Sequence, residues 1–154
     1  GQARGELNLG QLVRERVPES CYLVGFTTHD GAVTAATVWD AAAEHKRVNP
    51  SRGDSIEGLL HATGQKRFLL PLRDEPLLLR TLEPALLQRA IGVIYRPETE
   101  RQSHYFHAQG GRQFDALIHI DRTSAVVPLE ADALWTSGRA THVSEAAETY
   151  PQGL

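Results

Sequence analysis

The sequence has no methionine and a single cysteine among its 154 residues. Because Cys21 has no second thiol to pair with inside the chain, an internal disulfide framework is excluded, and a cytoplasmic location is expected. The chain opens with Gly1 instead of methionine. We therefore expect either that an initiator residue was removed or that the chain is a piece of a longer protein.

Long apolar runs and an excess of basic residues are also missing. No run approaches the ~20 residues that cross a bilayer, so we expect no membrane partner. The formal net charge of -3 gives no electrostatic reason to bind nucleic acid. Hydrophobic residues make up 41% of the chain, which is enough for a globular core, and 154 residues is the size of a single domain.

The motif of one common hydrolase nucleophile is absent as well. No G-x-S-x-G occurs, so the strand-to-helix elbow that exposes a serine in α/β-hydrolases is not predicted. Cys21 enters an apolar strand, where a free thiol usually behaves as a small hydrophobic side chain. We therefore assign Cys21 a structural role.

The strongest pattern that is present lies in residues 21–39, CYLVGFTTHDGAVTAATVW. Two runs rich in β-branched and aromatic residues flank Asp30-Gly31, a dipeptide typical of tight reversals, which predicts a β-hairpin over 21–39. Thr28 and His29 follow the first run. In open α/β sheets ligands bind outside the carboxyl ends of strands, so a site is predicted there.

The rest of the chain predicts alternating helices and strands, and hence an α/β fold. A helix should follow Asn8 and end before Pro18, and a second should be capped by Asp54 or Ser55 and ended by Gly64. The other predictions are one or two helical turns in 40–47, strands over 66–72, 93–95, 114–120 and 125–127, an amphipathic helix over 77–90 that Pro84 starts or kinks, and a polar loop over 96–111.

Among the seven histidines, His29 has the most promising position. It precedes Asp30, and a neighbouring carboxylate can orient an imidazole and raise its basicity. The alternative is that Asp30-Gly31 serves turn formation only, with no role for His29 in a site.

Other polar residues allow two interpretations each. His104 and His107 stand three residues apart, but no third ligand is fixed near them, so exposed loop polarity is favoured over a metal site. His119 alternates with apolar residues in a predicted strand and is expected in the core or at a sheet edge. The charged run 96–101 either lines a polar pocket as an Arg–carboxylate network or is a solvated cluster.

Five stretches, taken in order, resemble the landmarks of one family. They are GELNLGQLVRER, VGFTTHDGAVTAA, EHKRV, IGVIYRPETERQSHYFHA, and FDALIHID with PLE behind it. They resemble the carboxyl-terminal part of erythromycin esterase-like proteins. On this basis residues 1–130 are assigned to that part of the domain, and 131–154, which has no recognised counterpart, is expected to be a loosely packed tail.

The resemblance implies a three-layer α/β arrangement with a central, mostly parallel sheet between helices. It also implies hydrolysis of an ester or lactone by a water that a histidine activates, with no cofactor and no obligatory metal. The family's paired-histidine motif, His-Asn-Ser-His, normally precedes the GELNLGQL stretch and is not in this chain. We therefore assign no catalytic residue, and expect Thr28, His29, Arg96 and Tyr105 to line the wall of the site on position alone.

Two functional interpretations follow. In the first, the chain supplies scaffold and pocket wall to an esterase-like hydrolase and is inactive by itself. In the alternative, it is a non-catalytic binding or assembly module that kept the fold. If half of a sheet is missing, an apolar face or strand edge should be exposed and recruit another copy, so a homodimer is expected.

Overall fold

The computed structural model describes residues 8–127, which belong to two compact units. The described part of the first unit comprises 8–29, 51–89 and 106–121, and that of the second comprises 30–50, 90–105 and 122–127. Both units are therefore assembled from segments that are far apart in the sequence.

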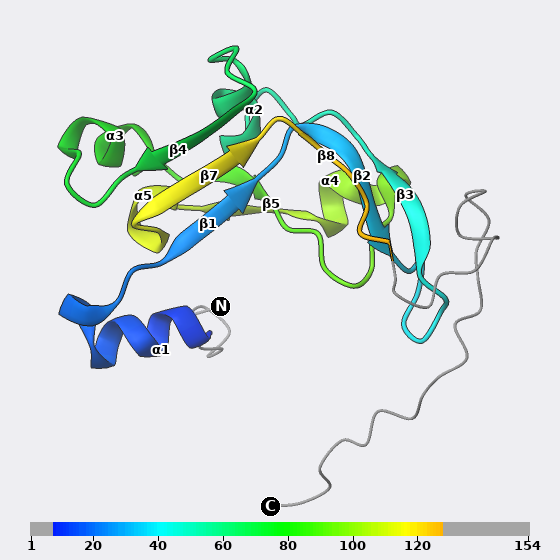
Figure 1. The fold of residues 1–154 in the computed structure, drawn as a ribbon, viewed down its shortest axis with the longest axis horizontal. Helices are drawn as coiled ribbons and strands as arrows, with labels where there is room; N and C mark the ends of the chain where they lie inside the picture. Colours follow the sequence, from blue (N-terminus) through cyan, green and yellow to red (C-terminus); the bar gives the residue numbers. More distant parts are fainter. Residues whose placement is uncertain (1–7, 128–154) are drawn as a thin grey trace, which may run out of the picture. The chain divides into compact units, whose positions relative to one another are not determined.

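The first unit is built on a three-stranded sheet with the order β1-β7-β4 (Figure 1). The strands are β1 (Val24–Thr27), β7 (Ala116–Ile120) and β4 (Arg67–Pro71). β1 runs parallel to the central strand β7, and β4 runs antiparallel to it. The predicted strands over 66–72 and 114–120 are confirmed.

Helix ends of the first unit follow local sequence signals. α1 (Leu9–Arg16) is capped by Asn8, whose side chain accepts a hydrogen bond from the backbone N–H of Gln11. A short 3₁₀ helix, η2 (Pro18–Ser20), follows α1. α2 (Ile56–His61) is capped by the Ser55 side chain, and Gly64 lies beyond it with a φ of 74°, a backbone conformation that favours glycine. These predicted caps and stops are confirmed.

The segment after β4 differs from the prediction. α3 (Pro76–Thr81) is short, and the chain then continues as strand β5 (Leu86–Arg89) instead of one long helix. Pro84 lies between them, where its missing N–H and fixed φ prevent helix continuation. The expected loop over 96–111 holds four short elements: η3 (Pro97–Thr99), α4 (Glu100–Ser103), β6 (Tyr105–Ala108), which pairs with β5, and α5 (Gly110–Gln113).

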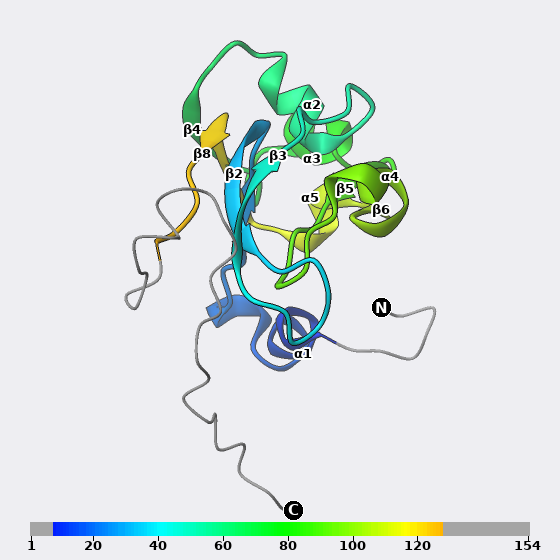
Figure 2. The same cartoon turned by 90° about the vertical axis from the view of Figure 1, so that its right-hand side faces the viewer.

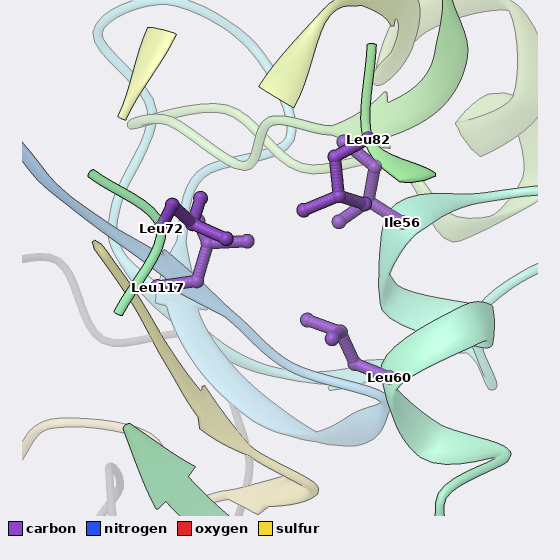
Figure 3. Close-up of a cluster of buried hydrophobic side chains, with 5 residues drawn as sticks. All are labelled: Ile56, Leu60, Leu72, Leu82 and Leu117. Atoms are coloured by element: carbon purple, nitrogen blue, oxygen red, sulfur yellow. The ribbon is translucent and has the colours of Figure 1, made fainter. Parts of the chain in front are cut away.

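The core of the first unit lies between α2 and one face of the sheet. Ile56 and Leu60 of α2 point toward Leu72 and Leu117 (Figure 3). Leu82 completes this buried cluster. Figure 2 shows α2, α3 and α5 on the same side of β4. The covered face of the sheet is therefore the one that carries Leu117.

The opposite face of this sheet exposes apolar side chains. Phe26 of β1 and Leu69 of β4 both pair with Ile118 of β7, so the three residues form a row across the sheet. Phe26 is 70% exposed and Leu69 is 62% exposed. Side chains of this kind on adjacent strands form a contiguous apolar surface, which we call the apolar sheet face.

Asp115, immediately before β7, connects α1 to the sheet. Its carboxylate accepts hydrogen bonds from Arg14 of α1 at 3.0 Å and from Arg73 at 3.1 Å. The backbone N–H of Leu23 adds a third at 2.7 Å. Burial acts to raise the pKa of Asp115, but these hydrogen bonds outweigh it and the pKa is lowered.

The second unit contains a sheet with the order β3-β2-β8. β2 (Asp30–Ala35) runs antiparallel to β3 (Glu44–Val48) and parallel to β8 (Arg122–Thr123). Its buried apolar cluster consists of Ala35, Val48 and Tyr95.

The predicted three-layer fold with a central, mostly parallel sheet is wrong. The described residues form sheets of three, three and two strands, with parallel and antiparallel pairing mixed. The predicted hairpin over 21–39 is wrong as well, because β1 pairs with β7, whereas β2 pairs with β3 and β8. Both errors concern which strands meet, which the local pattern does not encode.

Three smaller predictions about secondary structure also differ from the structure. The predicted helical turns in 40–47 are wrong, because residues 44–48 form β3 and no helix occurs in 40–43. The predicted strand over 93–95 is reduced to a single bridge between Ile94 and Ala36, and the one over 125–127 is irregular. The predicted tail, 131–154, lies outside the described residues. Among residues 8–127 no helix is long and apolar enough to cross a membrane.

Gly31 is required by the approach of two strands. It has a φ of 127°, and a Cβ at this position would lie 2.1 Å from the backbone oxygen of Thr123. A Gly31→Ala substitution should therefore lower the free energy of unfolding by about 2 kcal/mol. Gly53→Ala is the matched control, because no atom lies within 4 Å of its Cβ position. Urea denaturation measures both, and equal losses would contradict the explanation.

Candidate functional site

The candidate site lies where the parallel strands β1 and β7 end. Thr27 is the last residue of β1 and pairs with His119 of β7. Thr28 and His29 follow β1, and Asp121 follows β7. Carboxyl ends of adjacent parallel strands meet at one edge of a sheet, so residues that are distant in the sequence come together here.

The carboxylate of Asp121 is the centre of this cluster. Its Oδ1 accepts a hydrogen bond from Nδ1 of His61 at 2.5 Å, and its Oδ2 accepts one from Nζ of Lys66 at 3.2 Å. The backbone oxygen of Asp121 accepts a hydrogen bond from the N–H of His29 at 3.0 Å. Burial acts to raise the pKa of Asp121, but the hydrogen bonds from His61 and Lys66 lower it to about 2. Asp121 is therefore an anion at neutral pH.

The imidazole of His61 lies flat against that of His29. The ring centroids are 3.5 Å apart and the planes differ by 5°. Nδ1 of His29 lies 2.8 Å from the hydroxyl of Ser51. Each ring of the pair thus has its own polar partner, a hydroxyl for His29 and a carboxylate for His61.

His119 closes the inner side of the cluster. It is fully buried, its Nδ1 lies 3.0 Å from the hydroxyl of Thr27, and its Nε2 lies 3.5 Å from Oδ1 of Asp121. Burial lowers the pKa of His119, and the nearby Asp121 only partly offsets this. At neutral pH His119 is therefore a neutral core residue. Its position in the core was predicted, but a satisfied ring was predicted as well, and its buried Nε2 has no hydrogen-bond partner among the described residues.

Arg89 holds the backbone of Thr28 and His29 in place. The guanidinium of Arg89 donates hydrogen bonds to both backbone oxygens, at 2.5 Å and 2.9 Å. The backbone N–H of Arg89 donates to the carboxylate of Glu57, which is 2% exposed. Burial raises the pKa of Glu57, although the hydrogen bond from Arg89 opposes this. The hydrogen bonds from Arg89 therefore hold the backbone of the loop after β1 in one conformation.

The structure distributes the four predicted wall residues over both units. Thr28 and His29 are in the cluster of the first unit, where the Thr28 hydroxyl lies 3.5 Å from the backbone oxygen of Asp121. Arg96 and Tyr105 belong to the second unit. There the side chain of Arg96 donates to the backbone oxygen of Thr37, and Tyr105 is 7% exposed. Their role in the wall stays a prediction.

Sequence reasoning missed several members of the cluster. His61 is separated from Asp121 by 60 residues, and no spacing rule connects them. The carboxylate expected to orient an imidazole was Asp30 next to His29, and the contact between His61 and Asp121 was not predicted. Ser51 was not predicted as part of a site. The one available signal was that Asp121, like His29, follows a predicted strand.

The histidine pair His104 and His107 is divided between the two units. His104 is 9% exposed, and its Nε2 accepts a hydrogen bond from the backbone N–H of Arg96. Nδ1 of His107 lies 3.3 Å from the backbone oxygen of Ala85. Within 8–127 no group of three or more His, Cys, Asp or Glu residues is placed to hold a metal ion.

Comparisons with known proteins connect the chain to one family. A family model described as erythromycin esterase matches residues 1–123. The crystal structure of a succinoglycan biosynthesis protein has a TM-score of 0.64 and 24% identity, over 77% of this chain and 28% of that one. The crystal structure of a protein from Bacillus cereus has a TM-score of 0.62 and 18% identity, over 75% and 28%. The chain thus spans little more than a quarter of each, and at these identities the likeness concerns the fold alone.

The lowered pKa of Asp121 predicts how the stability of the folded chain depends on pH. Its folded-state pKa of about 2 lies below the ordinary 3.8, so its contribution is present above pH 3.8 and is lost as the pH falls toward 2. Asp121→Asn should therefore be less stable than the wild type near neutral pH, and the difference should shrink through this window. Urea denaturation across pH measures it. Asp74→Asn, at an exposed carboxylate, is the control, and a pH-independent difference for Asp121→Asn would contradict the prediction.

Proposed function

The chain belongs to the erythromycin esterase family, and from that premise we propose that it provides the scaffold and one wall of the site of a hydrolase acting on an ester or lactone. The observation that carries the proposal is the family match over residues 1–123. The cluster of His29, His61 and Asp121 supports it, because it lies at the carboxyl ends of parallel strands and offers groups that can hold or move a proton.

We also propose that the chain alone does not hydrolyse esters. The reason is that the resemblance assigns water activation to the His-Asn-Ser-His motif, and this motif does not occur in the sequence. The chain also spans only 28% of each of the two solved structures described above. A cytoplasmic location is part of the proposal and is supported by the single cysteine, Cys21.

A self-association of the chain is also proposed, through the apolar sheet face. Parallel strands are normally covered on both sides, yet Phe26 on β1, which is parallel to β7, is largely exposed. Leu69 on the antiparallel strand β4 is largely exposed as well. Because these two flank Ile118 in one row, the same surface on a second copy offers a complementary apolar partner. The occupant we propose is therefore a second copy of this chain.

The first test concerns activity. The purified chain should show no turnover of p-nitrophenyl esters above the rate of buffer, because a wall without the water-activating histidines lacks the base of the reaction. The matched variant is His29→Ala. Turnover by the wild-type chain that disappears in His29→Ala would place the chemistry in this chain and contradict the proposal. The alternative, a binding or assembly module, predicts the same inactivity of the chain alone. The two are distinguished by assaying a longer protein that contains both this chain and the paired-histidine motif, which should hydrolyse the ester only if the chain is part of a hydrolase.

The second test concerns association. Light scattering after size exclusion should give twice the monomer mass of 17.0 kDa. Phe26→Asp should give the monomer at the same concentration, because a buried charge at the interface is costly. Leu77→Asp is the control, since Leu77 is 69% exposed but lies on α3 and not on the apolar sheet face. A monomeric wild type over a tenfold concentration range would contradict the dimer.

A further inference from the structure

The described sheet of the first unit has two edge strands, β1 and β4, with β7 between them (Figure 1). The backbone N–H and C=O groups on the outer side of an edge strand can pair with a further strand. Proteins commonly protect an edge with a proline or with charged side chains, which discourage such pairing. The two edges of this sheet differ in this respect.

β4 is the protected edge. The backbone N–H of Leu72 donates a hydrogen bond to the backbone oxygen of Asp115, so the backbone groups of Leu72 point toward β7. Because the direction of these groups alternates along a strand, those of Pro71, Leu69 and Arg67 point outward. Pro71 has no N–H to offer on that side, and Arg67 adds a charge.

β1 is the unprotected edge. The backbone oxygen of Leu23 accepts hydrogen bonds from the N–H groups of Asp115 and Ala116, so it points toward β7. By the same alternation Val24 and Phe26 direct their N–H and C=O groups away from β7. Neither a proline nor a charged residue occurs in the sequence VGFT of β1. Across residues 8–127 these outward groups of Val24 and Phe26 have no hydrogen-bond partner.

The side chains along β1 indicate what kind of segment fits this edge. Val24 is 40% exposed and Phe26 is 70% exposed, and Phe26 belongs to the apolar sheet face. In a sheet the side chains of neighbouring strands lie beside each other on the same two faces. The fitting partner is therefore an extended polypeptide segment with apolar side chains at alternate positions.

The comparisons indicate a source for such a segment. The chain covers 28% of each of the two solved structures, so those proteins contain further chain that has no counterpart here. The paired-histidine motif to which the resemblance assigns water activation does not occur in this sequence either. Thr28 and His29 directly follow β1, so a segment paired along β1 has one of its ends beside them.

We propose that β1 is a docking edge, and that a strand from the remainder of a longer hydrolase pairs with the outward backbone groups of Val24 and Phe26. The inference rests on the proposed function, because it identifies the partner as the rest of the same enzyme. Strand addition uses backbone groups in the plane of the sheet, so the edge is distinct from the apolar sheet face. Docking at β1 brings the rest of the enzyme to the strand that ends at the candidate site.

The test is hydrogen–deuterium exchange, measured residue by residue on this chain and on a longer protein that contains both the chain and the paired-histidine motif. In the chain alone the amides of Val24 and Phe26 should exchange fast, and those of Gly25 and Thr27, which point toward β7, should be protected. In the longer protein exchange at Val24 and Phe26 should slow by roughly tenfold or more, because each amide then donates a hydrogen bond. The amide of Leu69, on the outer side of β4, is the internal control and should exchange fast in both proteins.

Two proline variants of the longer protein provide a second measurement. Val24→Pro removes an N–H that the added strand would bind, whereas Leu69→Pro removes one from the outer side of β4. The urea midpoint of unfolding should therefore be lower for Val24→Pro than for its matched control, Leu69→Pro. Equal midpoints, or the reverse order, would contradict the docking edge.

Fast exchange at Val24 and Phe26 in the longer protein would overturn the proposal, and so would protection that appears at Leu69 instead. Both results are read on proteins without a substitution, so they do not depend on the folding of a proline variant. A longer protein that does not hydrolyse esters would overturn the proposed function. The exchange pattern would still decide whether β1 is the docking edge, so the two failures are distinguishable.

Discussion

The carboxylates at the two ends of β7 connect most of the first unit. Asp115 before the strand accepts hydrogen bonds from Arg14 of α1 and from Arg73 after β4. Asp121 after the strand accepts them from His61 of α2 and from Lys66. Both carboxylates are buried, and an unpartnered buried charge is costly, so these elements are constrained to positions where the donors reach. The fixed position of the His61 imidazole in the candidate site is one result of this constraint.

Local signals in the sequence determined the parts of the fold that depend on neighbours along the chain. Asn8, Ser55 and Gly64 act within one helical turn, and their roles were predictable from residue type. Strand pairing was not predictable in this way, because β1 pairs with β7, about 90 residues away, and not with β2, which follows it in the sequence. The candidate site shows the same division. His29 could be found from its place after a strand, whereas the contact between His61 and Asp121 exists only once the sheet has formed.

The family relationship and the geometry contribute different things to the functional argument. Membership of the erythromycin esterase family rests on residues 1–123 and indicates a relationship to hydrolases. The arrangement of His29, His61 and Asp121 places two stacked imidazoles beside a buried carboxylate at the carboxyl ends of parallel strands. The likeness to two solved structures concerns the fold.

The two compact units cannot be cut apart as continuous pieces of sequence. The chain passes from one to the other after residues 29, 50, 89, 105 and 121, so removal of either unit would require several breaks. Four of these passages coincide with His29, Ser51, Arg89 and Asp121, which are the residues that order the imidazoles and the loop beside them. Neither unit is therefore encoded by one continuous segment of the gene. An insertion at one of these four passages would fall next to a residue that positions the imidazoles or the loop after β1.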